Sequence, residues 1–279
     1  MKAPGTPVAI LADNYKLLQD FILRQSGIVV DRDKHYLLES RLLPLAEARR
    51  LKSLNDLCNL LRAAGPASDV AREIVEAMTT HETLFFREPA QYDALRISIL
   101  PALLEERKSA RILSFWSAAA SSGQEAYSLA IVLRELGLDG WTIQILATDL
   151  STRILDRARQ GRYLPIEISR GLPPHLLHKY FHHEAGGHWS VRDEIRRMVQ
   201  FQQFDLRAST RGMGPFDVVF CRNVLIYFDQ ETVKRIIAGI RATLRPGGHL
   251  LLSSAENPSP LAEHFDRVET AGAVLFRLK

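Results

Sequence analysis

Residues 111–136 read RILSFWSAAASSGQEAYSLAIVLREL, and this stretch decides the fold. RILSFWSA (111–118) is a short apolar run with the length of a buried strand, and QEAYSLAIVLREL (124–136) has apolar residues at helical spacing. The turn between them consists of small residues, Ala119–Gly123. A strand, a turn of small residues and a helix in this order predict a parallel sheet that binds its ligand at the carboxyl ends of the strands.

The same alternation continues towards the carboxyl terminus. Strand-like and helix-like runs follow one another, which predicts a parallel sheet with helices on both faces. FDRVET (265–270) and AVLFRLK (273–279) flank Ala271-Gly272, and this pattern predicts a terminal hairpin that adds antiparallel pairing at the sheet edge. The alternating runs are WTIQILATDL (141–150), TRILDRARQ (152–160), FDVVFC (216–221), ETVKRIIAGIRATL (231–244) and GGHLLLSSA (247–255).

Residues 1–80 have a different character, because they contain helical patterns only. We expect a small all-α domain over 1–80, with helices beginning near Asp13, Asp33, Ser53 and Asp69, and an α/β domain over 81–279. The alternation in the α/β domain is interrupted by prolines and by the stretch HHEAGGHWSVRDEI (182–195). We interpret this interruption as a small inserted β subdomain at about 180–201.

Composition limits the class of protein. With 46% hydrophobic and 24% charged residues, the chain resembles an ordinary globular protein. It has no apolar run long enough to span a bilayer, its first residues lack the apolar core of a signal peptide, and it contains only two cysteines. We therefore expect a cytoplasmic protein without direct membrane insertion. The formal charge of +4 permits an acidic partner but does not identify one.

Polar residues follow the predicted strands at positions that suit a ligand. The turn at 119–123 lacks the three glycines of a dinucleotide fingerprint, which disfavours a pyrophosphate ligand. Glu125 could meet an ammonium group, or it could form a capping box with Ser122. Asp149 could accept hydrogen bonds from the hydroxyls of a ribose, or it could cap the helix that begins near Thr152.

A second pair of polar residues follows the strand FDVVFC. Asn223 offers a donor and an acceptor to an amide-like ligand edge. Tyr227, four residues further on, could face the same crevice or could be a core aromatic residue with its hydroxyl at the surface.

Taken together, five motifs resemble the CheR chemotaxis methyltransferases in order and spacing. They are THETLFFRE (80–88, preceded by Thr79), SAAASSGQEAYSLA (117–130), ATDLS (147–151), FCRNVLIYFD (220–229) and LRPGGHLLLSSAEN (244–257). The resemblance covers nearly the whole chain. It implies a Rossmann-like class I methyltransferase fold that binds S-adenosylmethionine and esterifies the glutamate side chains of chemotaxis receptors.

The resemblance also implies a set of site residues. Arg87 and Tyr227 would flank the reacting groups, and Arg87 would hold either the acceptor carboxylate or the carboxylate of the cofactor. The residues expected around S-adenosylmethionine are His81, Thr83, Arg87, Glu125, Asp149, Asp205, Leu206, Asn223 and Val224.

Four basic residues in the helical domain, Arg41, Arg49, Arg50 and Lys52, could dock the Glu-bearing helices of methyl-accepting receptors, or they could form a solvated helix face. We expect no nucleic-acid partner. We also expect no metal at His182, His183 and His188, whose spacing fits no standard helical pair of ligands. Two alternatives stay open: a methyltransferase of this fold with another acceptor, and a non-catalytic module that binds the cofactor or the receptor.

Overall fold

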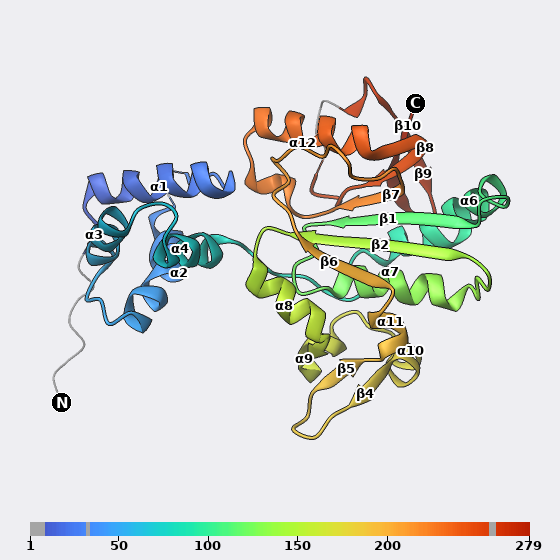
Figure 1. The fold of residues 1–279 in the computed structure, drawn as a ribbon, viewed down its shortest axis with the longest axis horizontal. Helices are drawn as coiled ribbons and strands as arrows, with labels where there is room; N and C mark the ends of the chain where they lie inside the picture. Colours follow the sequence, from blue (N-terminus) through green and yellow to red (C-terminus); the bar gives the residue numbers. More distant parts are fainter. Residues whose placement is uncertain (1–8, 32–33, 257–260) are drawn as a thin grey trace. The chain divides into compact units, whose positions relative to one another are not determined.

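The structure of the chain, a computed structural model, describes residues 9–31, 34–256 and 261–279. It divides into two compact units (Figure 1): a helical unit that ends at Thr80 and includes Tyr227–Asp229, and a larger unit formed by His81–Ile226 and Gln230–Lys279. Asp33, where a helix is expected to begin, and Asn257, the last residue of the fifth motif, lie outside the described residues.

Amphipathic helices with polar caps form the helical unit. Ser53 accepts a hydrogen bond from the backbone N of Asp56, as the sequence predicts, and Ser68 accepts one from Ala71 N at the start of the next helix. Leu18, Leu38 and Leu57 are completely buried in the core that the helices share. In the described part of the chain these helices are α1 (Ala12–Ser26), α2 (His35–Ala48), α3 (Leu54–Ala64) and α4 (Asp69–Met78).

A seven-stranded sheet is the centre of the larger unit, with strand order β6-β2-β1-β7-β8-β10-β9. β10 is antiparallel to both β8 and β9, whereas the other pairs are parallel, so the predicted mostly parallel sheet with an antiparallel terminal hairpin is confirmed. The strands are β1 (Ile112–Ala118), β2 (Thr142–Asp149), β6 (Val199–Gln203), β7 (Phe216–Cys221), β8 (Leu244–Leu251), β9 (Phe265–Thr270) and β10 (Ala273–Leu278).

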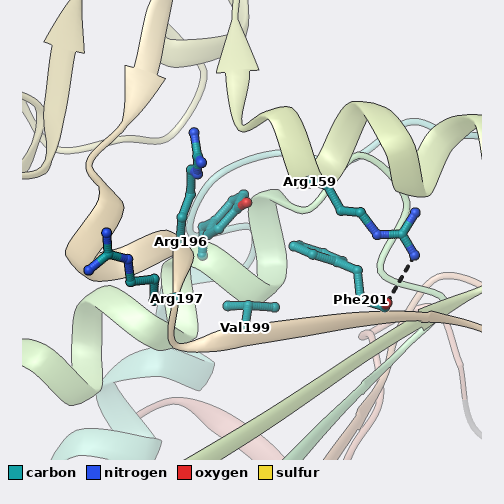
Figure 2. A pocket seen from close by; sticks show the side chains of 6 residues that line it. Arg159, Arg196, Arg197, Val199 and Phe201 are labelled. Carbon is teal, nitrogen blue, oxygen red and sulfur yellow. Dashed lines mark hydrogen bonds between the residues drawn. The ribbon is translucent and has the colours of Figure 1, made fainter.

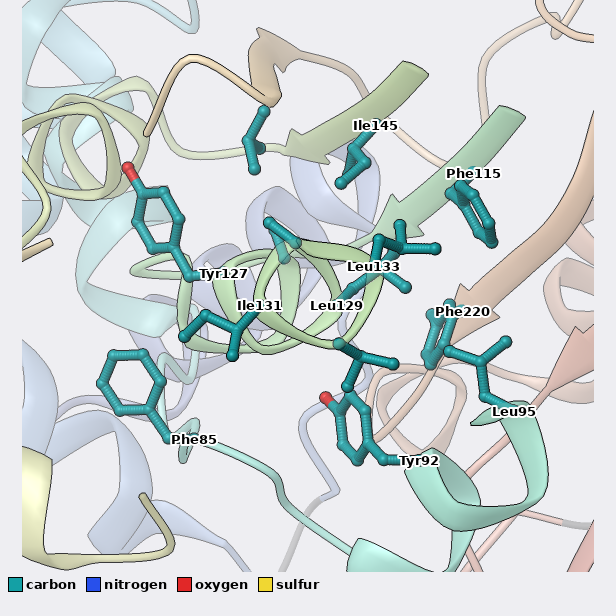
Figure 3. Packing of buried hydrophobic residues seen from close by; sticks show 14 of the residues in the cluster. Phe85, Tyr92, Leu95, Phe115, Tyr127, Leu129, Ile131, Leu133, Ile145 and Phe220 are labelled. Carbon is teal, nitrogen blue, oxygen red and sulfur yellow. The ribbon is translucent and has the colours of Figure 1, made fainter. Parts of the chain in front are cut away.

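Helices cover both faces of this sheet, as the alternating pattern predicts. In Figure 1, α7 and α8 lie below the strands and α12 lies above them. Figure 3 shows Leu129 and Leu133 of α7 among Phe115, Ile145 and Phe220 of the strands, and all five side chains are buried. The helices are α5 (Pro89–Ala94), the π-helical turn η1 (Leu95–Ile99), α6 (Leu100–Glu106), α7 (Gln124–Glu135), α8 (Thr152–Gln160), the 3₁₀ turn η2 (Leu225–Tyr227) and α12 (Gln230–Thr243).

A second, three-stranded sheet lies in the region of the expected insertion, but with different bounds. Its order is β3-β5-β4, with β3 (Arg162–Tyr163) well before residue 180. Val199–Phe201 belong instead to β6 of the main sheet, because they pair in parallel with Ile145–Ala147 of β2. The remaining elements here are β4 (Phe181–His183), β5 (Trp189–Val191), α9 (Pro165–Ser169), α10 (Pro174–Tyr180) and α11 (Asp193–Arg196).

β6 forms one edge of the main sheet, and a side chain covers part of that edge. The guanidinium of Arg159 on α8 donates a hydrogen bond of 3.0 Å to the backbone oxygen of Phe201 on β6 (Figure 2). Arg159 and Phe201 also line a pocket of about 280 Å³ together with Arg196 and Arg197. Within the described ranges, no helix is long and apolar enough to cross a bilayer.

A buried carboxylate joins β1 and β7 at their amino ends. Asp217 is completely buried, accepts hydrogen bonds from Ser114 N (2.8 Å) and Arg107 Nε (3.0 Å), and lies 3.3 Å from Arg245 Nε. Removing one partner of a buried charge pair typically costs about 3 to 5 kcal/mol, because the other charge loses its compensation. We expect Asp217→Ala to lower the free energy of unfolding of the larger unit by about that amount.

Urea unfolding followed by tryptophan fluorescence measures this effect selectively, since Trp116, Trp141 and Trp189 all lie in the larger unit. The control is Lys234→Ala, which removes an exposed ion pair with Glu231 and should change the free energy of unfolding by less than about 1 kcal/mol. Equal effects of the two variants would show that the Asp217 contacts do not stabilise the sheet.

Candidate functional site

The turn after β1 has an unusual backbone. Ala119 (φ 67°), Ser121 (φ 51°) and Gly123 (φ 95°) all occupy the left-handed region, which residues other than glycine rarely adopt. A Cβ at position 123 would lie 3.1 Å from the Cβ of Ala158, so glycine also fits the space there. Strained backbone of this kind concentrates at functional sites, and this turn follows the carboxyl end of β1.

Asp149 ends β2 beside this turn. Its carboxylate accepts hydrogen bonds from Ser121 N (2.9 Å) and Ser151 N (3.1 Å). The alternative in which Asp149 caps the next helix is wrong, because Ser151 is the N-cap residue of α8 and its side chain accepts a hydrogen bond from Ile154 N. Asp149 therefore fixes the turn after β1 to the end of β2, and only 8% of the residue is exposed.

Glu125 points back to the end of β1 rather than to its own helix terminus. Its carboxylate accepts hydrogen bonds from Ser117 Oγ (2.7 Å) and from the guanidinium of Arg222 (3.0 Å). The capping box with Ser122 is not formed, since Gly123 is the N-cap residue of α7 and no side chain caps that end. Burial raises the pKa of the Glu125 carboxyl, and the positive charge of Arg222 opposes this effect.

Arg222 connects three segments of the site and was not identified from the sequence. Its side chain is only 1% exposed and lies between the carboxylates of Glu125 (3.0 Å) and Glu88 (3.5 Å). It also donates a hydrogen bond of 2.6 Å to the backbone oxygen of Arg87. The sequence signal was its position directly after β7, a strand in which every residue is buried.

Glu256 holds the loop after β7 and was also missed. Its carboxylate accepts hydrogen bonds from four backbone N–H groups, those of Asn223, Val224, Leu225 and Ser253, at 2.8 to 3.0 Å. Asn223 has a φ of 57°, a left-handed conformation that these bonds stabilise. Asn223 and Val224 are thus placed through their backbone, and Glu256 ties them to the end of β8.

The segment 81–88 reaches the same edge of the sheet. The backbone oxygen of His81 accepts a hydrogen bond from Ser121 Oγ (3.0 Å), and Phe86 N donates one to Ser128 Oγ (2.9 Å). A Cβ at Gly171 would lie 2.1 Å from the backbone oxygen of Phe85, so only glycine allows the chain to pass here. His81 therefore lies beside the turn after β1.

Thr83 and Arg87 are among the partly exposed residues of this segment. Among the described residues, the guanidinium of Arg87 makes one hydrogen bond, of 3.2 Å, to the backbone oxygen of Glu82. An arginine has five N–H donors, so most of the donors of Arg87 are available to a ligand.

Asp205 and Leu206 follow β6 and lie near Asp149, because Phe204 N donates a hydrogen bond of 3.0 Å to the backbone oxygen of Asp149. The Asp205 carboxylate is engaged by the guanidinium and the backbone N of Arg207, at 2.6 to 3.1 Å. Leu206 is partly exposed.

Tyr227 is grouped with the helical unit, where its backbone oxygen accepts a hydrogen bond from Val29 N (2.9 Å). Its expected catalytic role stays a prediction. No group of three or more His, Cys, Asp or Glu side chains in the described ranges could hold a metal ion.

The charges at this edge of the sheet favour a cationic ligand. The carboxylates of Glu88 and Glu125 contact the buried guanidinium of Arg222, and Glu256 and Asp149 add two further carboxylates at this edge. A dinucleotide would bring phosphate charges of the same sign. S-adenosylmethionine carries an ammonium and a sulfonium and no phosphate, so the groups present fit it.

The Arg222–Glu125 pair gives a testable consequence. Arg222→Met should lower the free energy of unfolding by about 3 to 5 kcal/mol, because Glu125 and Glu88 lose their buried counter-charge. The double variant with Glu125→Gln should be less destabilised than the sum of the two single variants, because the two residues are in contact. Urea unfolding of the four proteins measures both effects.

The free energy of unfolding of the Arg222→Met variant should depend on pH, and the sign of this dependence follows from the pKa of Glu125. A carboxyl whose pKa is raised by folding stabilises the protein most below its unfolded value of 4.5 and loses this contribution as the pH rises. Arg222→Met should therefore regain stability as the pH falls towards 4.5, and the double variant should regain less. Additive effects with no difference in pH dependence would show that the pair is not coupled.

Comparisons with known proteins agree with this geometry. Residues 13–79 match the family described as CheR methyltransferase, all-alpha domain, and residues 81–274 match CheR methyltransferase, SAM binding domain. The chain is 38% identical over 271 residues to chemotaxis protein methyltransferase 1 of Pseudomonas aeruginosa, covering 95% of this chain and 98% of that protein.

Two further relatives have similar coverage. Chemotaxis protein methyltransferase Cher2 of Pseudomonas putida is 37% identical over 271 residues, with 95% of this chain and 98% of the relative covered. Chemotaxis protein methyltransferase 1 of Vibrio cholerae is 36% identical over 279 residues, with 98% and 100% covered. The chain therefore belongs to the CheR family of S-adenosylmethionine-dependent chemotaxis methyltransferases.

Proposed function

We propose that the chain transfers the methyl group of S-adenosylmethionine to glutamate side chains of chemotaxis receptors, giving glutamate methyl esters. The observation that carries this proposal is the arrangement at the carboxyl ends of β1 and β2, where Glu125 and Asp149 lie on either side of the strained turn 119–123. The names of the relatives, which describe chemotaxis methyltransferases, support the choice of acceptor.

In this proposal the carboxylates hold the two ends of the cofactor. Glu125 lies nearest to the ammonium group and Asp149 accepts hydrogen bonds from the ribose hydroxyls. His81, Thr83, Asn223 and Val224 line the cofactor from their two loops, and Asp205 and Leu206 line it beside Asp149. When bound, S-adenosylmethionine supplies an electrophilic methyl group on its sulfonium.

The acceptor needs no general base, because an unperturbed glutamate has a pKa of about 4.3 and is ionised at neutral pH. The protein then has to place a carboxylate oxygen in line with the methyl group and the sulfur. Such positioning can lower the activation free energy by up to about 7 to 11 kcal/mol. Arg87 holds either the acceptor carboxylate or the carboxylate of the cofactor through its planar guanidinium. Arg222 and Glu88 fix the backbone of Arg87, and Tyr227 orients the acceptor by a hydrogen bond.

The test combines the chemistry of the product with a variant of Arg87. Radiolabelled methyl should pass from S-adenosylmethionine to membranes that contain the host receptors, and mild base should release it as methanol, because carboxyl esters are base-labile. Arg87→Ala should lower turnover at least about a hundredfold, equivalent to about 2.7 kcal/mol of transition-state stabilisation. The control is Arg96→Ala, which removes an exposed ion pair with Asp93 and should retain activity.

Three outcomes would contradict the proposal in different ways. Base-stable label would indicate an acceptor other than a carboxylate. Absence of any label, with measurable cofactor binding, would favour the non-catalytic alternative. Normal turnover of a folded Arg87→Ala protein would remove Arg87 from the mechanism while leaving the reaction intact.

We further propose that the helical unit docks the receptor through its basic residues, chiefly Arg50 and Lys52. Arg41 donates to Met78 O (2.7 Å) and Thr80 Oγ1 (2.8 Å), and Arg49 forms a two-bond ion pair with Glu73 (2.7 and 2.9 Å), so both have internal roles. Arg50 and Lys52 are exposed, and their side chains make no ion pair among the described residues. They are therefore available to the acidic surface of a methylation helix.

Charge reversal at two pairs of positions distinguishes docking of the receptor at Arg50 and Lys52 from a general effect of the net charge. Arg50→Glu with Lys52→Glu should raise the KM for receptor about tenfold at low salt and less at high salt, because exposed charges are screened. The control, Lys16→Glu with Arg72→Glu, changes the net charge equally at two exposed positions of the same unit. An identical KM for both double variants would defeat docking through Arg50 and Lys52.

A further inference from the structure

A pocket of about 490 Å³ lies beside the candidate site, within the larger unit. It is lined by the first residues of α5, the residues that follow β8 and the start of β10. None of the residues that we expect around S-adenosylmethionine lines it. The proposed methyl transfer therefore does not account for this pocket.

Two buried polar atoms of the lining residues lack a partner. Gln91 and Ser253 are 4% and 2% exposed, and Gln91 Oε1 and Ser253 Oγ have no hydrogen-bond partner among the described residues. The orientation of the Gln91 amide follows from its other end, because Nε2 donates to Leu252 O (2.6 Å) and to Glu88 Oε2 (2.9 Å). Buried polar groups without partners are rare in native proteins, and each calls for an explanation.

Both unpartnered oxygens in this pocket can accept a hydrogen bond: Gln91 Oε1 can only accept, and the Ser253 hydroxyl can accept or donate. The Glu88 carboxylate accepts a hydrogen bond from Gln91 Nε2 (2.9 Å) and has longer contacts of 3.3 and 3.4 Å with Ser254 N. The Glu256 carboxylate already receives four backbone N–H groups. The cationic lining residue, Arg267, forms an ion pair with Glu269. A ligand that donates hydrogen bonds would satisfy both oxygens, whereas a negative charge would meet Glu88.

The remaining walls are apolar. Ala90, Leu252, Val274 and Phe276 line the pocket together with these acceptors. Apolar walls that lead to hydrogen-bond acceptors suit a side chain or small molecule with an alkyl stem and a cationic head.

We propose that this pocket binds a primary ammonium or guanidinium group on a short alkyl stem, supplied either by a side chain of the receptor or by a free amine. The head group donates to Gln91 Oε1, Ser253 Oγ and Glu88, and the stem lies against Leu252 and Phe276. This site goes beyond the proposed methyl transfer and does not depend on it. Because Glu88 also contacts Arg222, which holds the backbone of Arg87, occupancy of the pocket acts next to the reacting groups.

Calorimetry with n-butylammonium on the full chain tests the proposal without any methyl transfer. We expect saturable binding of one ligand, with no binding of 1-butanol or butyrate, which have the same length but lack the charge or reverse it. Ser253→Ala removes only the unpartnered hydroxyl and should weaken binding at least tenfold. Ala90→Phe fills the pocket and should abolish binding, whereas Ala90→Ser, the matched control, should retain it.

Several results would overturn the proposal: no saturable binding of n-butylammonium to the wild-type chain, equal binding of 1-butanol, or unchanged affinity in both Ser253→Ala and Ala90→Phe. If Ala90→Phe fails to fold, Ser253→Ala decides alone, because it removes a single buried oxygen. A protein that binds n-butylammonium but transfers no methyl would retain this inference and disprove the proposed function.

A second measurement identifies the source of the cation. If the pocket takes a receptor side chain, n-butylammonium should raise the KM for receptor in the methylation assay without changing kcat. If it takes a free amine, the compound should change kcat or the affinity for S-adenosylmethionine while the KM for receptor stays constant. Either result supports a cation site, and an effect that persists unchanged in Ser253→Ala would contradict it.

Discussion

One buried guanidinium, that of Arg222, holds the candidate site together. It joins the residue after β7 to α7 through Glu125 and to the segment 81–88 through Glu88 and the backbone of Arg87. A charge of this kind is stable in the interior only while its partners are present, because desolvation is costly and only close, well-oriented carboxylates offset it. Charge compensation therefore helps to fix the three segments relative to one another, together with the hydrogen bonds of His81 and Phe86.

Around this centre, backbone strain and backbone hydrogen bonds define the edge of the sheet. The left-handed residues Ser121 and Asn223 are held by carboxylates, Asp149 on one side and Glu256 on the other. These carboxylates accept hydrogen bonds from main-chain N–H groups. They therefore fix the conformation of the loops whether or not a ligand is bound. A rigid loop at the carboxyl edge pre-organises the site, which lowers the ordering cost of binding.

Much of the architecture could be predicted from the sequence because the signal for it is local. The runs that became β1, α7 and β2 have the periodicity of buried strands and helices, and the Ala271-Gly272 turn between β9 and β10 has a clear hairpin signature. The position of Asp149 at a strand end followed from the same pattern. Its role with a ligand stays a prediction.

The position of Arg222 after a strand is visible in the sequence, but the contacts of Arg222 and Glu256 could not be predicted in this way, because their partners are distant in sequence or are backbone groups without a residue signature. The capping box at Ser122 failed for a related reason. Spacing alone could not show that Gly123 would adopt a left-handed conformation and become the N-cap residue. The bounds of the small sheet were missed because a two-residue strand such as β3 leaves almost no periodicity to read.

The contact between Arg159 and β6 affects the tendency of the protein to associate at high concentration. β6 is a five-residue edge strand, and an open edge offers a template for strands of other molecules. The charged side chain of Arg159 on α8 donates a hydrogen bond to the backbone oxygen of Phe201, so this acceptor is no longer free for a strand of another molecule. The arginine thereby favours separate molecules over sheet-to-sheet association at high concentration.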